Sequence, residues 1–464
     1  MNFDDLKEDI HRQLSSKALY GQAKDYAFEY MDSLDAGRVI PDAESIAALE
    51  ALDEPMPEGP SDPSAILRTL HETGSRAAVS QSGGRYFGFV NGGNFPVAIA
   101  AKWLSDAWDQ NSALFVMSPI AAILEEVCEK WIVDLLGLPA ETAAGLVSGS
   151  STATLCALAA ARNALLLKQN WDVHQDGLFG APPLRVVLGE QAHSSVIKAL
   201  SLMGIGKNQL IWAGVDEQGR ILPERLPALD ENTLLIAQAG NVNGGAFDPL
   251  DTLCGMANRA GAWIHIDGAF GLWAAASGEK RHLIAGFEGA DSWSADAHKT
   301  LNVPYDCGIV LCRRRQALVQ AMQASGSYIQ YSQHRDAMLY TPEMSRRARG
   351  VELWATMKYL GKSGVGALVE ELCHNAQYFA ERLSGRGFKV VNDVVFNQVL
   401  VRCDSPEKTA ATLKCIQEGG ELWCGGAEWR GEPVIRISVS CWRTSRQDVD
   451  ACVEAFVRAR DDSD

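Results

Sequence analysis

The sequence predicts an α/β protein in three parts: a helical N-terminal extension at 1–78, a large domain at 79–340 and a small C-terminal α/β domain at 341–464. Short β-rich runs alternate with helical stretches through the middle of the chain, which is typical of a mostly parallel sheet covered by helices. A second, shorter set of alternations follows near the C-terminus. A chain of 464 residues is long enough to bury a core in both of these domains.

Each part has its own pattern. Up to about Leu70 the chain carries amphipathic helical patterns, which are interrupted at 54–63, where four prolines exclude a continuous helix. A helix is expected to begin near Arg346 and to lead into the small domain. The strands expected in the large domain are 185–188, 233–236, 263–266 and 308–311, and those expected in the small domain are 396–402 and 434–440.

A lysine follows a histidine at His298-Lys299, after the strand-like run 291–297 and ahead of another apolar run. Alone, such a pair is typical of a solvated loop. Upstream, however, Asp267 ends the apolar strand 263–266. A lysine amine can bind the aldehyde of pyridoxal 5′-phosphate, and a buried carboxylate can hold a proton on the ring nitrogen of this cofactor. We therefore expect Lys299 to be the covalent anchor and Asp267 the electronic partner.

A third segment favours a phosphate site. Residues 144–154 pass from an apolar run through small hydroxylated residues into the helical stretch 155–162. Small residues let backbone N–H groups approach a phosphate, and a helix N-terminus adds partial positive charge. By themselves, Ser150 and Ser151 would be more typical of an ordinary helix N-cap than of a phosphate site. The joint presence of the three segments favours a cofactor site.

These segments resemble the group II pyridoxal-phosphate-dependent amino-acid decarboxylases, the family of aromatic-L-amino-acid, histidine, glutamate and diaminobutyrate decarboxylases. The resemblance runs roughly from Arg85 to Arg443. It implies fold type I, pyridoxal 5′-phosphate as cofactor and decarboxylation of an L-amino acid to its amine. It also implies that His193 stacks on the cofactor ring, that Ala269 contacts the ring and that Ser150 and Ser151 hold the phosphate. The cofactor-binding residues that it implies are Ser150, Ser151, His193, Asn241, Asp267, Ala269, His298 and Lys299.

The catalytic residues that the resemblance implies are Lys299, His193, Asp267 and Tyr328. Tyr328 matches a mobile-loop tyrosine that protonates the product carbanion, and Tyr331 is close enough to be the alternative. Either could also be an ordinary packing tyrosine. Where the family often has two threonines, this chain has Asn241, which can still donate a hydrogen bond.

An aromatic segment resembles the one that lines the family's substrate pocket. Tyr86, Phe87 and Phe89 favour a substrate with an aromatic or apolar side chain, although such residues can equally be core. The rival functions are another outcome on the same fold, namely oxidative deamination to an aldehyde, C–C lyase or aldol chemistry, or transamination, and a non-catalytic scaffold. His193 and Tyr328 favour decarboxylation, and intact Lys299 and Asp267 argue against a scaffold.

Composition limits the partners. A formal net charge of −16 and a pI near 5.1 argue against nucleic acid and anionic membranes. Eleven cysteines without a C-x-x-C pair, no signal-like segment after Met1 and no membrane-length apolar run predict a cytoplasmic enzyme. No metal is expected. The resemblance implies a homodimer, in which the N-terminal part packs on the partner subunit.

Overall fold

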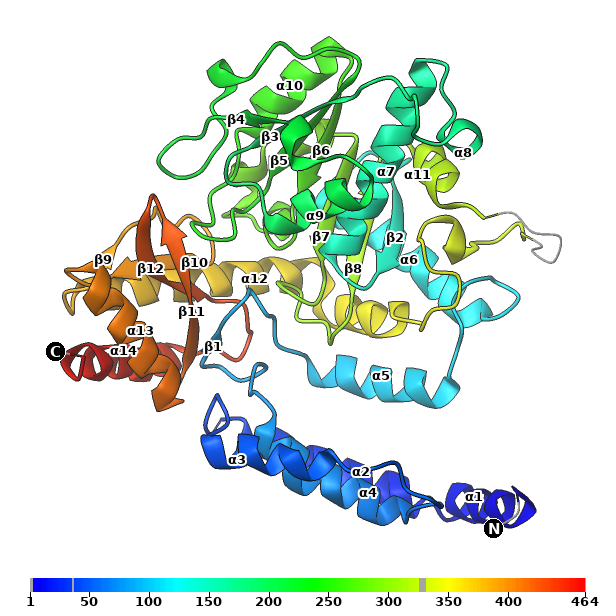
Figure 1. The fold of residues 1–464 in the computed structure, drawn as a ribbon, viewed down its shortest axis with the longest axis vertical. Coiled ribbons are helices and arrows are strands. Elements are labelled where there is room, and N and C mark those ends of the chain that lie inside the picture. The colour runs from blue at the N-terminus through cyan, green and yellow to red at the C-terminus, as the bar shows by residue number, and fades with distance from the viewer. Residues whose placement is uncertain (1–2, 36, 325–330, 464) are drawn as a thin grey trace.

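The protein is described by a computed structural model that covers residues 3–35, 37–324 and 331–463. Its N-terminal helices form a layer at one end of the molecule, below the rest of the chain in Figure 1. None of these helices has a buried residue. A proline-rich stretch separates the third helix from the fourth, as the sequence predicts. The helices are α1 (Phe3–Ser16), α2 (Ala18–Ser33), α3 (Ala43–Ala47) and α4 (Pro63–Thr69).

The middle of the chain forms a seven-stranded sheet in the order β2-β8-β7-β6-β5-β3-β4. Strand β8 runs antiparallel to both of its neighbours, and every other pair is parallel. The predicted α/β class with a mostly parallel sheet is therefore confirmed. The strands are β2 (Ala143–Val147), β3 (Arg185–Gly189), β4 (Leu210–Ala213), β5 (Thr233–Gln238), β6 (Trp263–Asp267), β7 (Ser292–Asp296) and β8 (Gly308–Cys312).

Helices cover both faces of this sheet because successive strand residues point to opposite sides. In β5, Leu234 and Ile236 belong to one apolar cluster, and Leu235 and Ala237 to another. Helices α7, α9 and α11 contribute to the first cluster, and α6, α10 and α12 to the second. The helices of this region are α5 (Pro96–Trp108), α6 (Pro119–Leu136), α7 (Ser150–Lys168), α8 (Val173–Asp176), α9 (Ser194–Leu202), α10 (Leu250–Ala260) and α11 (Arg315–Met322).

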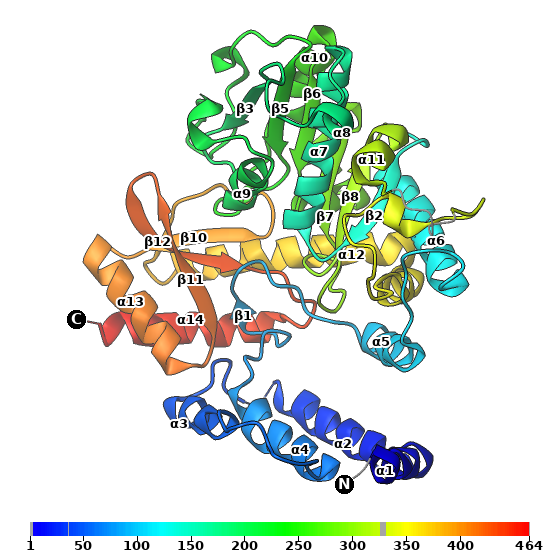
Figure 2. The same cartoon turned by 45° about the vertical axis from the view of Figure 1, so that its right-hand side comes forward.

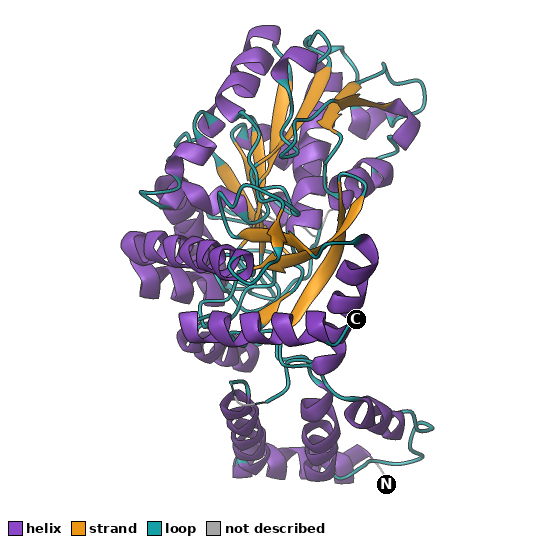
Figure 3. Ribbon diagram, turned by 90° about the vertical axis from the view of Figure 1, so that its left-hand side faces the viewer, coloured by secondary structure: helices purple, strands orange, loops and turns teal. Residues whose placement is uncertain are grey.

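A second sheet lies near the C-terminus, in the order β1-β11-β12-β10-β9, and Figure 3 separates the two groups of strands. The first of its strands comes from far upstream: Tyr86 pairs with Trp423 in a parallel register. The helix expected near Arg346 begins at Gly350, and the divisions at 78 and 340 stay predictions. The elements are β1 (Tyr86–Phe87), α12 (Gly350–Ser384), β9 (Lys389–Val390), β10 (Gln398–Arg402), α13 (Pro406–Gly419), β11 (Trp423–Trp429), β12 (Glu432–Ser438) and α14 (Arg446–Asp461).

The long helix α12 connects the two sheets. Figure 2 shows it running beneath the large sheet and beside the C-terminal one, and its apolar residues contribute to the cores of both. It bends at Gly361, whose φ of 60° is a left-handed conformation that glycine adopts without steric cost. Within the described ranges, no helix is long and apolar enough to cross a membrane.

The carboxyl ends of the parallel strands meet at one edge of the large sheet. Gln238 of β5 is opposite Asp267 of β6, which is in turn opposite Ser294 of β7. This edge is where α/β proteins usually bind ligands, because the loops and helix N-termini that follow the strands converge there. Strand register therefore brings residues from three separate segments of the chain to a common edge.

Helix α7 begins at the same edge because its first turn lies against the start of β8. Gly308 pairs with Val147 on one side and with Asp296 on the other. A Cβ added at Gly308 would lie 2.4 Å from the Cα of Gly149, the N-cap of α7. Only glycine permits this approach, which brings the first amides of α7 to the end of β7.

Candidate active site

The predicted anchor Lys299 lies in the turn that follows β7. Its Nζ is 2.8 Å from Oδ2 of Asp296, the last residue of that strand. The other oxygen of this carboxylate, Oδ1, accepts a hydrogen bond of 2.6 Å from the backbone N–H of Ser150. Burial disfavours the charged form of Asp296, but the charge of Lys299 and the hydrogen bonds from Lys299 and Ser150 hold its pKa below the ordinary value.

His298 has one ring nitrogen committed to the backbone. Its Nδ1 accepts a hydrogen bond of 3.0 Å from the N–H of Cys307, so the neutral ring carries its proton on Nε2. This Nε2 is 3.6 Å from Oδ1 of Asp296. Burial lowers the pKa of His298, and the ring stacks on Tyr305 with centroids 4.4 Å apart. The histidine is therefore a fixed, neutral donor that points toward the α7 N-terminus.

Asp267 is buried at the end of β6. The N–H of Ala269 donates to its Oδ1 at 3.2 Å, so Ala269 fixes this carboxylate through its backbone. Burial raises the pKa of Asp267, while the nearby charges of His193 and Lys299 act in the opposite direction. A cationic partner would therefore stabilise the ionised carboxylate.

His193 is the N-cap of α9, and this role fixes its ring. Its Nδ1 accepts from the backbone N–H of Ser195 at 3.2 Å and lies 2.7 Å from the hydroxyl of the same residue. Burial lowers the pKa of His193, which favours a neutral imidazole. His193 follows β3, Asp267 ends β6, and Lys299 is paired with Asp296 at the end of β7, so the order of these parallel strands brings the three predicted residues to the same edge of the sheet.

Three further residues predicted to bind the cofactor, namely Ser150, Ser151 and Asn241, differ in burial and in the hydrogen bonds that they make. Ser150 is buried and offers its backbone N–H, whereas Ser151 is exposed at the start of α7. Asn241 is buried, and its Oδ1 accepts from the backbone N–H groups of Asn243 and Gly244. Among the described residues, its Nδ2 donates to Gln191 O alone, at 3.5 Å. In this structure the amide of Asn241 therefore shapes its own loop.

The three aromatic residues predicted to line the substrate pocket lie in two environments. Phe87 is fully buried against Phe379 in the C-terminal core and exposes no surface. Tyr86 and Phe89 both stack on Trp423, with centroids 5.3 and 5.1 Å apart. Tyr86 also lines a cavity of about 740 Å³ between the N-terminal extension and the loop that follows Lys299.

The same segment packs against the lysine turn. The N–H of Gly92 donates to His298 O at 3.3 Å, and a Cβ added at Gly92 would lie 2.0 Å from Lys299 O. Tyr305 donates to Asn91 Oδ1 at 2.9 Å.

Tyr328 lies outside the described residues. Its alternative, Tyr331, is exposed and donates to Ala324 O.

Sequence reasoning missed two residues near this cluster. One is Asp296, which precedes His298 by two positions and could have been found from its place at the end of a buried strand. The other is Arg436 of β12, which donates to Asn243 Oδ1 at 3.2 Å. Its buried Nε has no hydrogen-bond partner within the described ranges, and its charge helps to lower the pKa of His193.

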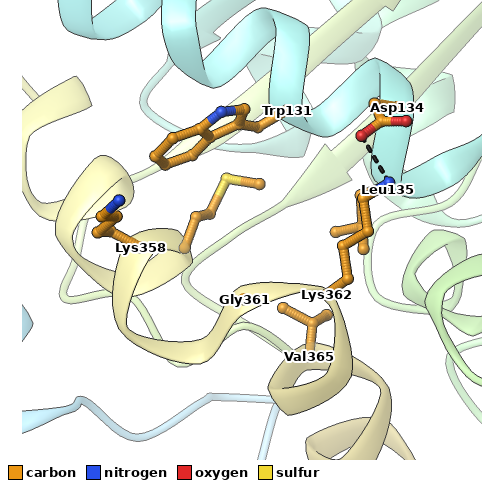
Figure 4. Close-up of a pocket in the computed structure, with 8 residues that line it drawn as sticks. Trp131, Asp134, Leu135, Lys358, Gly361, Lys362 and Val365 are labelled. Carbon is orange, nitrogen blue, oxygen red and sulfur yellow. Dashed lines mark ion pairs between the residues drawn. The ribbon is translucent and has the colours of Figure 1, made fainter.

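A separate cavity of about 310 Å³ lies between α6 and α12 at the Gly361 bend (Figure 4). Trp131, Met357 and Val365 provide its apolar lining, and an ion pair of 2.6 Å joins Lys362 to Asp134 at its rim. No predicted cofactor residue lines this cavity, so it is separate from the Lys299 cluster.

The residues around Lys299 fit pyridoxal phosphate. An amine can bind the aldehyde, and a buried carboxylate that needs a cation suits the ring nitrogen. A neutral imidazole offers a flat face, and the α7 N-terminus together with His298 offers donors for a phosphate. Each of these groups is held by backbone hydrogen bonds or by an ion pair, which reduces the cost of ordering the site on binding.

Comparison with known proteins agrees with this fit. Residues 47–403 match the model of the pyridoxal-dependent decarboxylase conserved domain. The aromatic-L-amino-acid decarboxylase of Bacillus atrophaeus is 30% identical over 354 residues, which are 73% of this chain and 71% of that protein. The acidic amino acid decarboxylase GADL1 of Mus musculus is 28% identical over 355 residues, which are 73% of this chain and 62% of that protein.

A crystal structure of Oryza sativa TDC with PLP and tryptamine has the same fold. Its TM-score is 0.87 at 22% sequence identity, and the match covers 100% of this chain and 99% of that chain. The predicted fold type I and the predicted cofactor are both confirmed. The chain therefore belongs to the pyridoxal-dependent decarboxylase family, as a PLP-dependent carboxy-lyase that acts on an amino acid.

Proposed function

We propose that the chain decarboxylates an L-amino acid with an aromatic or apolar side chain to the corresponding amine. The observation that carries this proposal is the joint placement of Lys299, Asp267 and His193 at one edge of the large sheet, where β3, β6 and β7 end. Bound pyridoxal phosphate supplies an electron sink for the pair of electrons left on Cα when the bond to the carboxylate breaks. CO2 leaves as this bond breaks, and the protein must then place a proton on Cα.

Each residue of this cluster has a distinct task in the proposal. Lys299 provides the amine that attaches the cofactor, and Asp267 keeps a proton on the ring nitrogen by offering it a buried anion. His193 is held by its N-cap hydrogen bonds with its ring plane fixed, which suits it to stack on the cofactor ring. Tyr328 is proposed as the acid that protonates Cα, with Tyr331 as the alternative.

The proposed substrate preference rests on the groups beside this cluster. Arg436 is a half-buried cation whose buried Nε has no hydrogen-bond partner among the described residues, and it suits a substrate carboxylate. Tyr86, Phe89 and Trp423 form a continuous aromatic stack near the lysine turn. Such rings favour an aromatic or apolar side chain over a charged one.

We also propose that the chain is a homodimer and that the second copy covers its N-terminal face. Phe28 of α2 stacks on Trp103 of α5, with centroids 6.1 Å apart, so the apolar surfaces of these helices are continuous. Both side chains are more than a third exposed, and Leu104 beside them is 56% exposed. A contiguous apolar surface of this kind is typical of a subunit interface, and a copy related by two-fold symmetry would cover both faces.

A cytoplasmic location belongs to the same proposal. Its support is the state of the cysteines: all eleven are unpaired and ten of them are buried, as expected of a chain that folds in a reducing compartment. Fractionation of cells that express the full chain tests this location.

Release of CO2 tests the proposed reaction. The purified protein with pyridoxal phosphate should release CO2 fastest from aromatic or apolar L-amino acids, with one amine formed per CO2. Lys299→Ala should nearly abolish release, because it removes the attachment point, whereas Lys198→Ala, at an exposed position on α9, should not. Borohydride treatment and peptide mapping should label Lys299. Labelling of another lysine, or no release from any amino acid, would contradict the proposal.

Asp267→Asn tests the electronic role. The amide keeps the shape but cannot hold the ring proton by charge, so turnover at saturating cofactor should drop by about 10²-fold or more, equivalent to about 3 kcal/mol. Asp248→Asn is the matched control, because Asp248 is also buried and accepts only backbone N–H groups. Near-parent turnover in Asp267→Asn would refute the role.

A product balance tests the reaction outcome. Tyr328→Phe removes the proposed acid, so the carbanion should be diverted toward oxygen, and aldehyde, peroxide and ammonia should rise while amine per CO2 declines. Tyr331→Phe is the paired variant and should leave the balance unchanged. The opposite result would assign the acid to Tyr331. A parent protein that already gives mainly aldehyde and peroxide would contradict amine formation.

Sedimentation velocity tests the dimer. The parent should sediment with about twice the chain mass of 50.2 kDa. Leu104→Glu should raise the monomer fraction, because it would bury a charge in the interface. Phe179→Glu is the control, since Phe179 is almost fully exposed and lies three residues after α8, a helix that Figure 1 shows far from α5. A monomeric parent would overturn the proposal.

A further inference from the structure

A backbone amide and an ammonium are within hydrogen-bond distance of one buried carboxylate, and an imidazole nitrogen lies just beyond that distance. The oxygen Oδ1 of Asp296 accepts from the N–H of Ser150 and is 3.6 Å from Nε2 of His298. The oxygen Oδ2 is 2.8 Å from Nζ of Lys299. Only 2% of the Asp296 side chain is exposed, so little water competes for these donors. The arrangement is an anion site in which the anion is a side chain of the protein.

Two of these donors are the ones that the proposed cofactor site offers to a phosphate. The Ser150 amide is at the N-terminus of α7, where helix geometry leaves backbone N–H groups free to bind an anion. His298 is held with its proton on Nε2, facing the same place. Asp296 cannot move away freely, because its backbone pairs with Gly308 in the middle of the sheet. A bound phosphate and this carboxylate would therefore be neighbours.

We infer that Asp296 competes with the cofactor's 5′-phosphate for the Ser150 amide and the His298 imidazole, and so sets how tightly the cofactor is held. The inference rests on the proposed cofactor site. A phosphate that enters it must share or take these donors from Asp296 and must tolerate a second negative charge nearby. Asp296 thus weakens the hold on the phosphate in particular, and not on the pyridine ring.

Asp296→Asn isolates this effect because the amide keeps the size and shape of the side chain. It removes the like charge, and its N–H₂ group can donate to a phosphate, which a carboxylate cannot do. The change also removes the ion pair with Lys299, which affects the amine that binds the aldehyde. A test must therefore separate the phosphate from the aldehyde.

Pyridoxal has the aldehyde but no phosphate, so a comparison of pyridoxal with pyridoxal phosphate separates the effect on phosphate binding from the effect on aldehyde binding. The cofactor is first removed from the parent protein and from Asp296→Asn. Dissociation constants for pyridoxal phosphate and for pyridoxal are then measured by absorbance for both proteins at one pH. We expect the ratio of the pyridoxal constant to the pyridoxal phosphate constant to rise by about tenfold or more in the variant. Inorganic phosphate should also raise the melting temperature of the variant more than that of the parent.

Asp291→Asn is the matched control. Asp291 directly precedes β7, at the opposite end from Asp296, and is also a buried carboxylate paired with a cation, Arg314. This variant loses the same charge and should leave the ratio unchanged. Asp296→Ser, which is smaller and neutral, is the second variant, and its ratio should shift in the same direction as that of Asp296→Asn.

Two outcomes would overturn the inference. If Asp296→Asn tightens both ligands equally, Asp296 acts only through the lysine. If the ratio shifts equally in Asp291→Asn, the effect is one of net charge. Failure of the cofactor site itself is distinguishable, because borohydride would then fail to fix pyridoxal phosphate on Lys299 in the parent.

Discussion

The site depends on the register between β6, β7 and β8. This register places Asp267 opposite Ser294 and Asp296 opposite Gly308, so two buried carboxylates end neighbouring strands at one edge of the sheet. The missing side chain at Gly308 lets the first turn of α7 approach the end of β7. A slip of one residue would turn every side chain of the strand to the other face and separate the acids from the lysine turn. The chemistry of the site follows from this pairing.

Buried charge is the second constraint, because an ionised group removed from water needs partners. The structure meets this need differently for the two acids. Asp296 has an ammonium, an imidazole and a helix N-terminus as partners. Asp267 has one backbone donor and a raised pKa, so it retains an unmet need for a cation. The first carboxylate is already satisfied by the protein, and the second is suited to a charged ring nitrogen.

The C-terminal sheet also contributes to the site. Strand β1 carries Tyr86 into that sheet, and the chain then continues directly to Gly92, which contacts the lysine turn. Arg436 of β12 reaches the loop at Asn243 from the same side. Aromatic rings and a half-buried cation of the C-terminal part thus lie beside the lysine turn and the Asn243 loop of the large domain. Both sheets, which α12 joins, thus contribute residues to this edge of the molecule.

The sequence by itself determined the α/β class, the main strands and the family, because these depend on local periodicity and on residue types at short spacing, as in His298-Lys299 and the strand that ends at Asp267. Tertiary structure alone decided which contacts other residues make. Phe87 packs in the C-terminal core, and the Asn241 amide makes hydrogen bonds within its own loop. The hydrogen bond between Ser150 and Asp296 joins positions 146 residues apart. The hydrogen bond between Arg436 and Asn243 joins positions 193 residues apart. No local pattern encodes such contacts, because they exist only once the strands have paired.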